Sequence, residues 1–312
     1  MNTRASDDSS FKTGDADSYN DVVDYFDHFT DRFSQHLPGP MLELAAIQSQ
    51  HKILDVGTGT GVVALSAASR LNGPGVVTGI DLSDGMLANA RDKAEKLNLG
   101  QHCRFLKMDA EKLDFEDACF DSVVSLYALR HFPNPEIAVR EFHRVIKEHG
   151  RIVIAVGSRP TLLSGDGVRA AGRKIASLLR KARGKELVAC EFIDRLVEEF
   201  IPGSSNAEVT EWSEHQHEFT GSVEGLLTSC GFCNVQSTWR GQYSIIESVE
   251  DFWSLQMTFS SLARKRIGQA EDAVVARLKE KFTRECETVL ARQGRLVYQS
   301  GAAIISASKP AD

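Results

Sequence analysis

Residues 53–61 read ILDVGTGTG, a short apolar run that passes through Asp55 and ends in three alternating glycines. An apolar run of this length that stops at glycine is typical of a buried strand followed by a tight turn. The following residues, 61–71, have helical spacing. Glycine allows a ligand to approach the backbone, and the helix N-terminus offers N–H donors. The segment therefore predicts a ligand-binding turn between a strand and a helix.

The spacing of these glycines narrows the choice of ligand. Gly57, Gly59 and Gly61 form G-x-G-x-G, whereas the dinucleotide fingerprint is G-x-G-x-x-G and would need glycine in place of Val62. Asp55 would also repel a pyrophosphate. These features disfavour a nicotinamide-dependent oxidoreductase. A carboxylate beside the turn suits a ligand with a cationic amino-acid moiety, and S-adenosylmethionine has both this moiety and a cationic sulfonium.

Apolar runs alternate with helical patterns downstream, which predicts a parallel sheet with crossover helices. Ser83 is the expected N-cap of the second helix, Pro135 lies in the first turn of the third, and Gly150 is its expected C-cap. The expected strands are 51–57, 74–81, 103–110, 120–129 and 151–158, and the helices between them are 61–71, 83–99 and 134–150.

Acidic residues end three successive strands of this pattern. Asp55 ends the first, Asp81 the second, and Asp109 the third. Such folds bind ligands at the carboxyl edge of the sheet, where these residues meet. Asp81 is placed to accept hydrogen bonds from both ribose hydroxyls, and Asp109 to accept one from an adenine amino group.

The motifs ILDVGTGTG (53–61), GIDLSDGML (79–87), MDAEKLDF (108–115) and the block 120–154 resemble the successive motifs of class I S-adenosylmethionine-dependent methyltransferases. The last block resembles the ubiquinone and menaquinone biosynthesis branch, which also has a Leu-Arg pair after the fourth strand. The resemblance covers residues 40–158 strongly, and Cys230-Gly231-Phe232 with the closing strand more loosely. It implies an α/β, doubly wound, seven-stranded and mostly parallel sheet of the Rossmann-like methyltransferase type.

The resemblance also implies a role for each motif residue in binding S-adenosylmethionine and its product, S-adenosylhomocysteine. The methionine part is expected at Gly57, Thr58 and Gly59, its amino group at Asp55, the ribose at Asp81, the adenine at Leu82, Met86, Asp109 and Ala110, and the sulfonium at Leu126. A tight turn or a helix cap is the alternative role for each glycine and aspartate. Tyr19, in a helix that closes over the cofactor in relatives, is expected at the carboxylate end. Tyr19 and Tyr25 have aromatic packing as the alternative.

Catalytic candidates directly follow the fourth strand. His131 could act as general base, because its pKa can be tuned across neutrality, or it could cap or pack the loop. Arg130 could orient an oxygenated or anionic acceptor, or form a surface salt bridge. We expect no metal site, since His215 and His217 have no acidic partners at ligand spacing.

The outer segments complete the expected organisation: a disordered tail (1–15), an N-terminal helical cap (16–50), the cofactor-binding core (51–158), a helical lid insertion without a strand (159–220), and the remaining two strands (221–312) with one or two long helices inserted at 248–293. Phe252 is a candidate wall of an apolar acceptor cavity, or part of a core. Residues 159–185 hold eight basic residues and one acidic residue, a segment that could attract an anionic acceptor or form a solvated helix face.

Bulk composition favours a cytoplasmic enzyme with a small-molecule substrate. The formal net charge is -7, which argues against nucleic acid as a partner. No run is apolar enough to span a bilayer. Cys230 and Cys233 lack a second pair at zinc-ribbon spacing, so free thiols are expected. A homodimer remains open.

The expected activity is methyl transfer to carbon or oxygen of a small molecule, including an anionic or natural-product-like one. Nucleic-acid and protein amino-group methyltransferases often carry Asn/Asp-Pro-Pro-aromatic after the fourth strand, where this chain has Ser125-Leu126-Tyr127-Ala128. The alternative is a member of the same fold that binds the cofactor without transferring methyl groups.

Overall fold

The computed structural model describes residues 12–14, 16–17, 19–20, 22–158, 165–202 and 222–311, without the side chains of Asp31, residues 165–171 and Ser261. Their contacts form two compact units. The core unit comprises 1–157, 214–238 and 302–312, and the second unit comprises 158–213 and 239–301. His215, His217 and Arg159 lie outside the described residues, as does the tail except for 12–14, which is helical rather than disordered.

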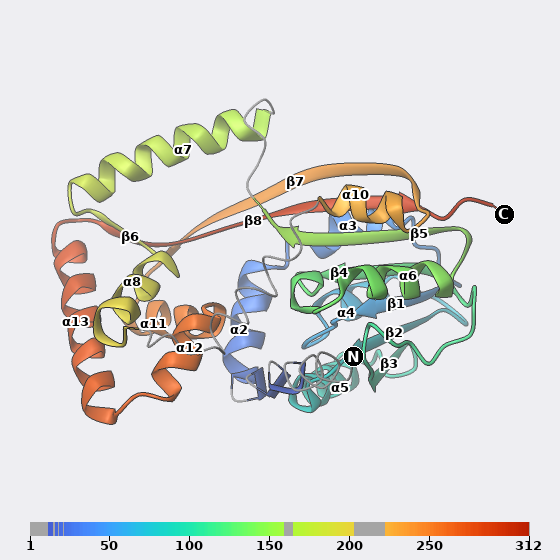
Figure 1. Cartoon of the computed structure of the whole chain (residues 1–312), viewed down its shortest axis with the longest axis horizontal. Helices are drawn as coiled ribbons and strands as arrows, with labels where there is room; N and C mark the ends of the chain where they lie inside the picture. The colour runs from blue at the N-terminus through green and yellow to red at the C-terminus, as the bar shows by residue number, and fades with distance from the viewer. Residues whose placement is uncertain are drawn as a thin grey trace, which may run out of the picture. The chain divides into compact units, whose positions relative to one another are not determined.

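Five parallel strands form the centre of the core unit, in the order β3-β2-β1-β4-β5. β8 is antiparallel to β5, from Arg151↔Ser308 to Gly157↔Ala302. The predicted mostly parallel α/β fold is therefore confirmed. The strand bounds are β1 Lys52–Val56, β2 Val76–Asp81, β3 Cys103–Lys107, β4 Phe120–Leu126, β5 Ile146–Gly157, β6 Glu186–Val188, β7 Cys233–Ile246 and β8 Arg295–Ser308 (Figure 1).

The described residues contain eight strands, where seven were expected for the chain. β7 and β6 both pair with β8, and β6 is parallel to it. The prediction that residues 159–220 contain no strand is wrong, because β6 occupies Glu186–Val188. Three residues are too few to show a period-2 pattern, and they follow a strongly helical basic segment.

Helices cover both faces of the core sheet, because alternate strand residues face opposite sides. Leu54 and Val56 pack towards one layer and Ile53 towards the other. The first layer contains α6 (Pro135–Val145) and α10 (Val223–Ser229), and the second contains α3 (Pro38–Leu44), α4 (Val62–Ala68) and α5 (Asp84–Lys96). This is the doubly wound arrangement, with the carboxyl ends of β1, β2 and β4 at one edge.

Helix ends confirm two predictions and correct one. The Ser83 side chain accepts a hydrogen bond from Met86 N, and Pro135 occupies the first turn of α6. The prediction of Gly150 as a C-cap is wrong: α6 ends at Val145, and β5 begins at Ile146. Gly150 instead accepts a backbone hydrogen bond from Lys309 N at 3.0 Å, so pairing with the C-terminal segment keeps this polar stretch extended.

The second unit is mainly helical. Phe192, Phe252 and Phe282 form its buried aromatic centre, so Phe252 is part of a core, one of the two roles expected for it. The buried Gln256 side chain accepts hydrogen bonds from Cys190 N and Ile193 N and so caps α8. The helices are α7 Gly165–Ala182, α8 Glu191–Phe200, α11 Val249–Phe259, α12 Ser261–Gly268 and α13 Asp272–Ala291, which places three helices in the 248–293 insertion.

Candidate active site

The glycine turn at the end of β1 requires glycine for both conformational and steric reasons. Gly57, Gly59 and Gly61 have φ values of 66°, 53° and 83°. This left-handed region is strained for residues with a side chain. A Cβ atom on Gly57 would also lie 2.2 Å from Ala128 Cβ, after the fourth strand. The turn therefore packs directly against the segment that carries the catalytic candidates.

Asp55 is buried below this turn. Its Oδ2 accepts hydrogen bonds from Thr58 Oγ1 at 2.7 Å and Ala64 N at 3.0 Å. Its Oδ1 is also buried and has no hydrogen-bond partner among the described residues. Burial, opposed by the two hydrogen bonds and assisted by the nearby Asp81 charge, raises the pKa of Asp55 to about 7. Asp55 thus lacks a donor or cation for one carboxylate oxygen.

Asp81 ends β2 on the other side of the turn. It accepts hydrogen bonds from Gly59 N at 2.9 Å and Ser83 N at 3.0 Å. Burial raises the pKa of its carboxyl, whereas these N–H donors and the His131 ring lower it. Leu82 is half-buried, and the Met86 side chain is buried in the first turn of α5.

Asp109 follows β3 and already has two partners. Its Oδ1 accepts from Glu111 N at 2.9 Å, and its Oδ2 accepts from Lys12 Nζ at 2.7 Å. Lys12 Nζ also donates to Glu111 Oε2 at 2.7 Å. No motif or spacing in the sequence indicated a role for Lys12, which lies in the expected tail. The Ala110 side chain is buried in the hydrophobic core, so only its backbone can meet a ligand.

The segment after β4 holds a conformation that sequence reasoning missed. Tyr127 has φ 62°, and its N–H donates to Ala155 O at 2.8 Å. Burial raises the pKa of its hydroxyl to about 12, so the phenol stays protonated near neutral pH. Leu126 beside it is half-buried. Arg130 is exposed and donates to Gly157 O at 3.2 Å, so its guanidinium is held at the end of β5.

The N-terminal segment lies across the glycine turn. The Tyr19 ring makes edge contacts with the rings of Phe26 and His131, at centroid distances of 5.7 and 5.9 Å. Phe26, in α2 (Val23–Phe33), lies 3.7 Å from where a Cβ of Gly59 would be. The structure thus brings Tyr19 and His131 together beside Gly59 and Asp81.

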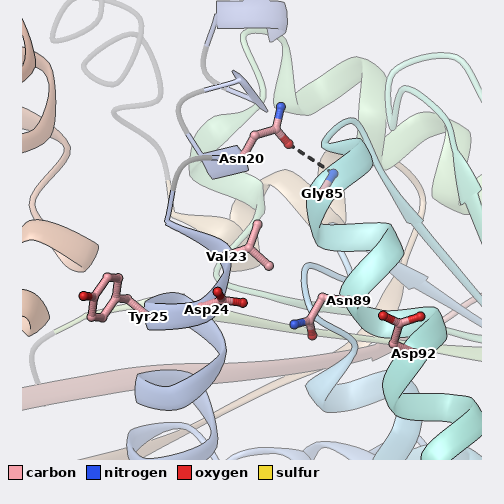
Figure 2. A pocket seen from close by; sticks show the side chains of 7 residues that line it. All are labelled: Asn20, Val23, Asp24, Tyr25, Gly85, Asn89 and Asp92. Atoms are coloured by element: carbon pink, nitrogen blue, oxygen red, sulfur yellow. Dashed lines mark hydrogen bonds between the residues drawn. The ribbon is translucent and has the colours of Figure 1, made fainter.

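Asn20 attaches this segment to α5. Its Oδ1 accepts from Ser83 Oγ at 2.7 Å and from Gly85 N at 3.1 Å, and Figure 2 shows the second bond. A surface pocket of about 370 Å³ lies here, lined by Asn20, Val23, Asp24, Tyr25, Gly85, Asn89 and Asp92. Tyr25 is 56% exposed and its ring points away from α5 in Figure 2. None of the seven belongs to the glycine turn, so this pocket is separate from it.

Comparison with known proteins shows similarity in the core: residues 54–154 match the methyltransferase domain family. Two solved structures share the fold at about one-fifth sequence identity. The YcgJ protein of Bacillus subtilis has a TM-score of 0.52 and 20% identity, over 89% of this chain and 99% of that one. A methyltransferase candidate from Bacillus halodurans C-125 has a TM-score of 0.50 and 21% identity, over 88% and 100%.

Curated relatives match part of the chain at higher sequence identity. The ubiquinone/menaquinone biosynthesis C-methyltransferase UbiE of Pseudomonas putida is 38% identical over 121 residues, which cover 38% of this chain and 47% of the relative. A phosphatidylethanolamine N-methyltransferase of Cereibacter sphaeroides is 41% identical over 103 residues, covering 33% and 49%. The chain thus spans about half the length of the curated relatives it matches. Among the described residues, no helix has the length and apolarity needed to cross a membrane.

Proposed function

We propose that this protein is an S-adenosylmethionine-dependent methyltransferase that acts on a small molecule. The observation that carries the proposal is the buried Asp55 Oδ1, which lacks a partner directly below a turn of three left-handed glycines. A cationic ammonium group meets the demand of such a carboxylate. When bound, S-adenosylmethionine supplies an electrophilic methyl group on a cationic sulfur.

The residues present fit this cofactor. Each Asp81 oxygen accepts one N–H bond, and a carboxylate oxygen has two acceptor positions, so both retain a position for a ribose hydroxyl. The left-handed turn at Gly57 and Gly59 lets a ligand approach the backbone. Thr58 Oγ1 is bonded to Asp55, which leaves the Thr58 backbone for the methionine part. Leu82, Met86, Asp109, Ala110, Leu126 and Tyr19 complete the proposed contacts.

His131 is the proposed general base and Arg130 the proposed acceptor-orienting residue. The His131 ring lies against Tyr19 beside the glycine turn, where an acceptor proton would be removed. Methyl transfer otherwise depends on holding the acceptor in line with the methyl group in a dry site. An acceptor carbon or oxygen is proposed. The similarity to an N-methyltransferase supports nitrogen as the second candidate.

Two further parts of the proposal are less direct. The six cysteines are all free, which supports a reducing compartment such as the cytoplasm. A homodimer is also proposed. A family member that binds the cofactor without methylating remains the alternative activity.

The test is transfer of a labelled methyl group from S-adenosylmethionine to panels of phenolic, carbon-acid and amine compounds, both anionic and neutral. We expect transfer to one class, with a pH profile that His131→Ala abolishes while S-adenosylhomocysteine still binds. Cofactor binding without transfer to any class would favour the binding-only alternative. Transfer only to amines would show that the acceptor atom is nitrogen and not carbon or oxygen.

A further inference from the structure

Helix α7 carries an exposed apolar row. Ile175, Leu178 and Leu179 are 60%, 55% and 53% exposed. Their spacing of three and four residues places them on one face of the helix. These are three of the eight large apolar side chains that are exposed among the described residues, and the other five are scattered over other elements. The apolar row on α7 is therefore a continuous feature and not incidental exposure.

The opposite face of α7 is polar and packs on its own unit. Ser177 is buried and donates to the buried Glu186 of β6, and Arg180 Nε donates to Glu186 Oε2 at 2.6 Å. Tyr243 Oη completes this cluster at 3.3 Å from the same oxygen. A helix on a globular unit normally buries its apolar face. In α7 the polar face is buried and the apolar face is exposed. The hydrogen bonds to Glu186 determine which face of α7 points outward.

Basic residues flank the apolar row. Lys174 lies four residues before Leu178 and Arg183 four residues after Leu179, whereas Arg173 lies four residues before Ser177, on the polar face. Lys174 and Arg183 are exposed, and neither forms an ion pair with the described residues. Lys181, by contrast, pairs with Glu191 at 2.5 Å. The outward face of α7 and the turn after it therefore combine apolar side chains with the uncompensated positive charges of Lys174 and Arg183, in a chain whose net charge is -7.

We propose that α7 is an interfacial helix that docks this protein on an anionic lipid surface. Apolar side chains on such a helix enter the acyl boundary, and flanking cations contact anionic headgroups. The 18 residues of α7 give a length of about 27 Å along the surface. A second copy of this chain fits this face less well, because it would bring an equally basic helix against it. The inference does not depend on the proposed methyl transfer.

The experiment measures binding of the whole protein to sedimented vesicles, either phosphatidylcholine alone or mixed with phosphatidylglycerol. We expect binding only to the mixed vesicles, and we expect salt to weaken it.

The apolar variant is Leu178→Glu with Leu179→Glu, and its matched control is Ile137→Glu, at an exposed apolar residue of α6. The charge variant is Lys174→Glu with Arg183→Glu, and its control is Lys96→Glu with Arg104→Glu, both exposed residues of the core unit. Each α7 variant should lower vesicle affinity by about tenfold or more, and each control by less than about twofold.

Thermal unfolding monitored by circular dichroism must show that every variant is folded. Three results would overturn the proposal: absence of binding by the folded wild-type protein, equal binding by the Leu178→Glu, Leu179→Glu variant, or equal binding to neutral and anionic vesicles. A lipid-free dimer that dissociates in the same variant would assign the apolar row to a second copy instead. S-adenosylhomocysteine binding, measured in parallel, separates this outcome from a failure of the proposed function.

Discussion

Asp55 is a buried carboxyl group, and burial disfavours its charged form. The carboxylate bonds to Thr58 Oγ1 and Ala64 N through one oxygen, while the other has no partner among the described residues. The acidic residue and the three glycines could be identified from sequence, because their spacing is local. The left-handed Tyr127 could not be identified, because its conformation depends on a hydrogen bond to Ala155 of β5, which is distant in sequence.

The raised pKa of Asp55 predicts a specific pH dependence of stability. The folded protein keeps this proton up to about pH 7, whereas the unfolded chain loses it near its ordinary value of 3.8. Folding therefore binds a proton in this window, and stability falls as pH rises through it. Between pH 5 and pH 8 the loss should be about 2–3 kcal/mol.

Asp55→Asn should remove this part of the pH dependence. Urea unfolding of both proteins at pH 5 and pH 8 measures it, and Asp114→Asn, at an exposed aspartate, is the matched control. A pH dependence that Asp55→Asn leaves unchanged would show that the carboxyl is ionised throughout this range.

Among the elements, the strands that carry motifs were predicted well and the connections less well. β1 to β4 lie within their expected ranges, and β5 extends from Ile146 because it pairs with the C-terminal segment. β6 had a weak signal because it is only three residues long. The boundary between α11 and α12 also had a weak signal, because a single N-cap residue, Ser260, marks it. The N-terminal segment differs most from expectation, because Lys12 makes two ion pairs where a disordered tail was predicted.

Lys12 should compete with the cofactor for Asp109. Its Nζ occupies Asp109 Oδ2, the group proposed to accept from the adenine amino group. Lys12→Met should therefore tighten S-adenosylhomocysteine binding by about fivefold, the size expected of one partly exposed ion pair. Calorimetric titration measures this affinity, and Lys96→Met controls for the loss of one positive charge. An unchanged or weaker affinity in Lys12→Met would mean that the Lys12 pair supports the site and does not compete with it.

For the whole molecule, the family match and the outward apolar helix face lie in different units. The methyltransferase family model matches residues 54–154 of the core unit, where motif order predicts the fold. The second unit contains the buried aromatic cluster and the outward apolar face of α7. Periodicity predicted helices there, but which face each helix buries depends on tertiary contacts such as Glu186 with Ser177. Sequence alone could not show that α7 exposes its apolar face.

Calorimetric titration with S-adenosylhomocysteine tests most directly whether the glycine turn is a cofactor site. The wild-type protein, Asp81→Ala and the control Asp84→Ala, at an exposed residue three positions further on, should be compared. We predict saturable 1:1 binding that Asp84→Ala retains and Asp81→Ala weakens by about a hundredfold, because two hydroxyl acceptors are lost. Absence of binding by the folded wild-type protein, or equal binding by Asp81→Ala, would contradict the assignment of this site.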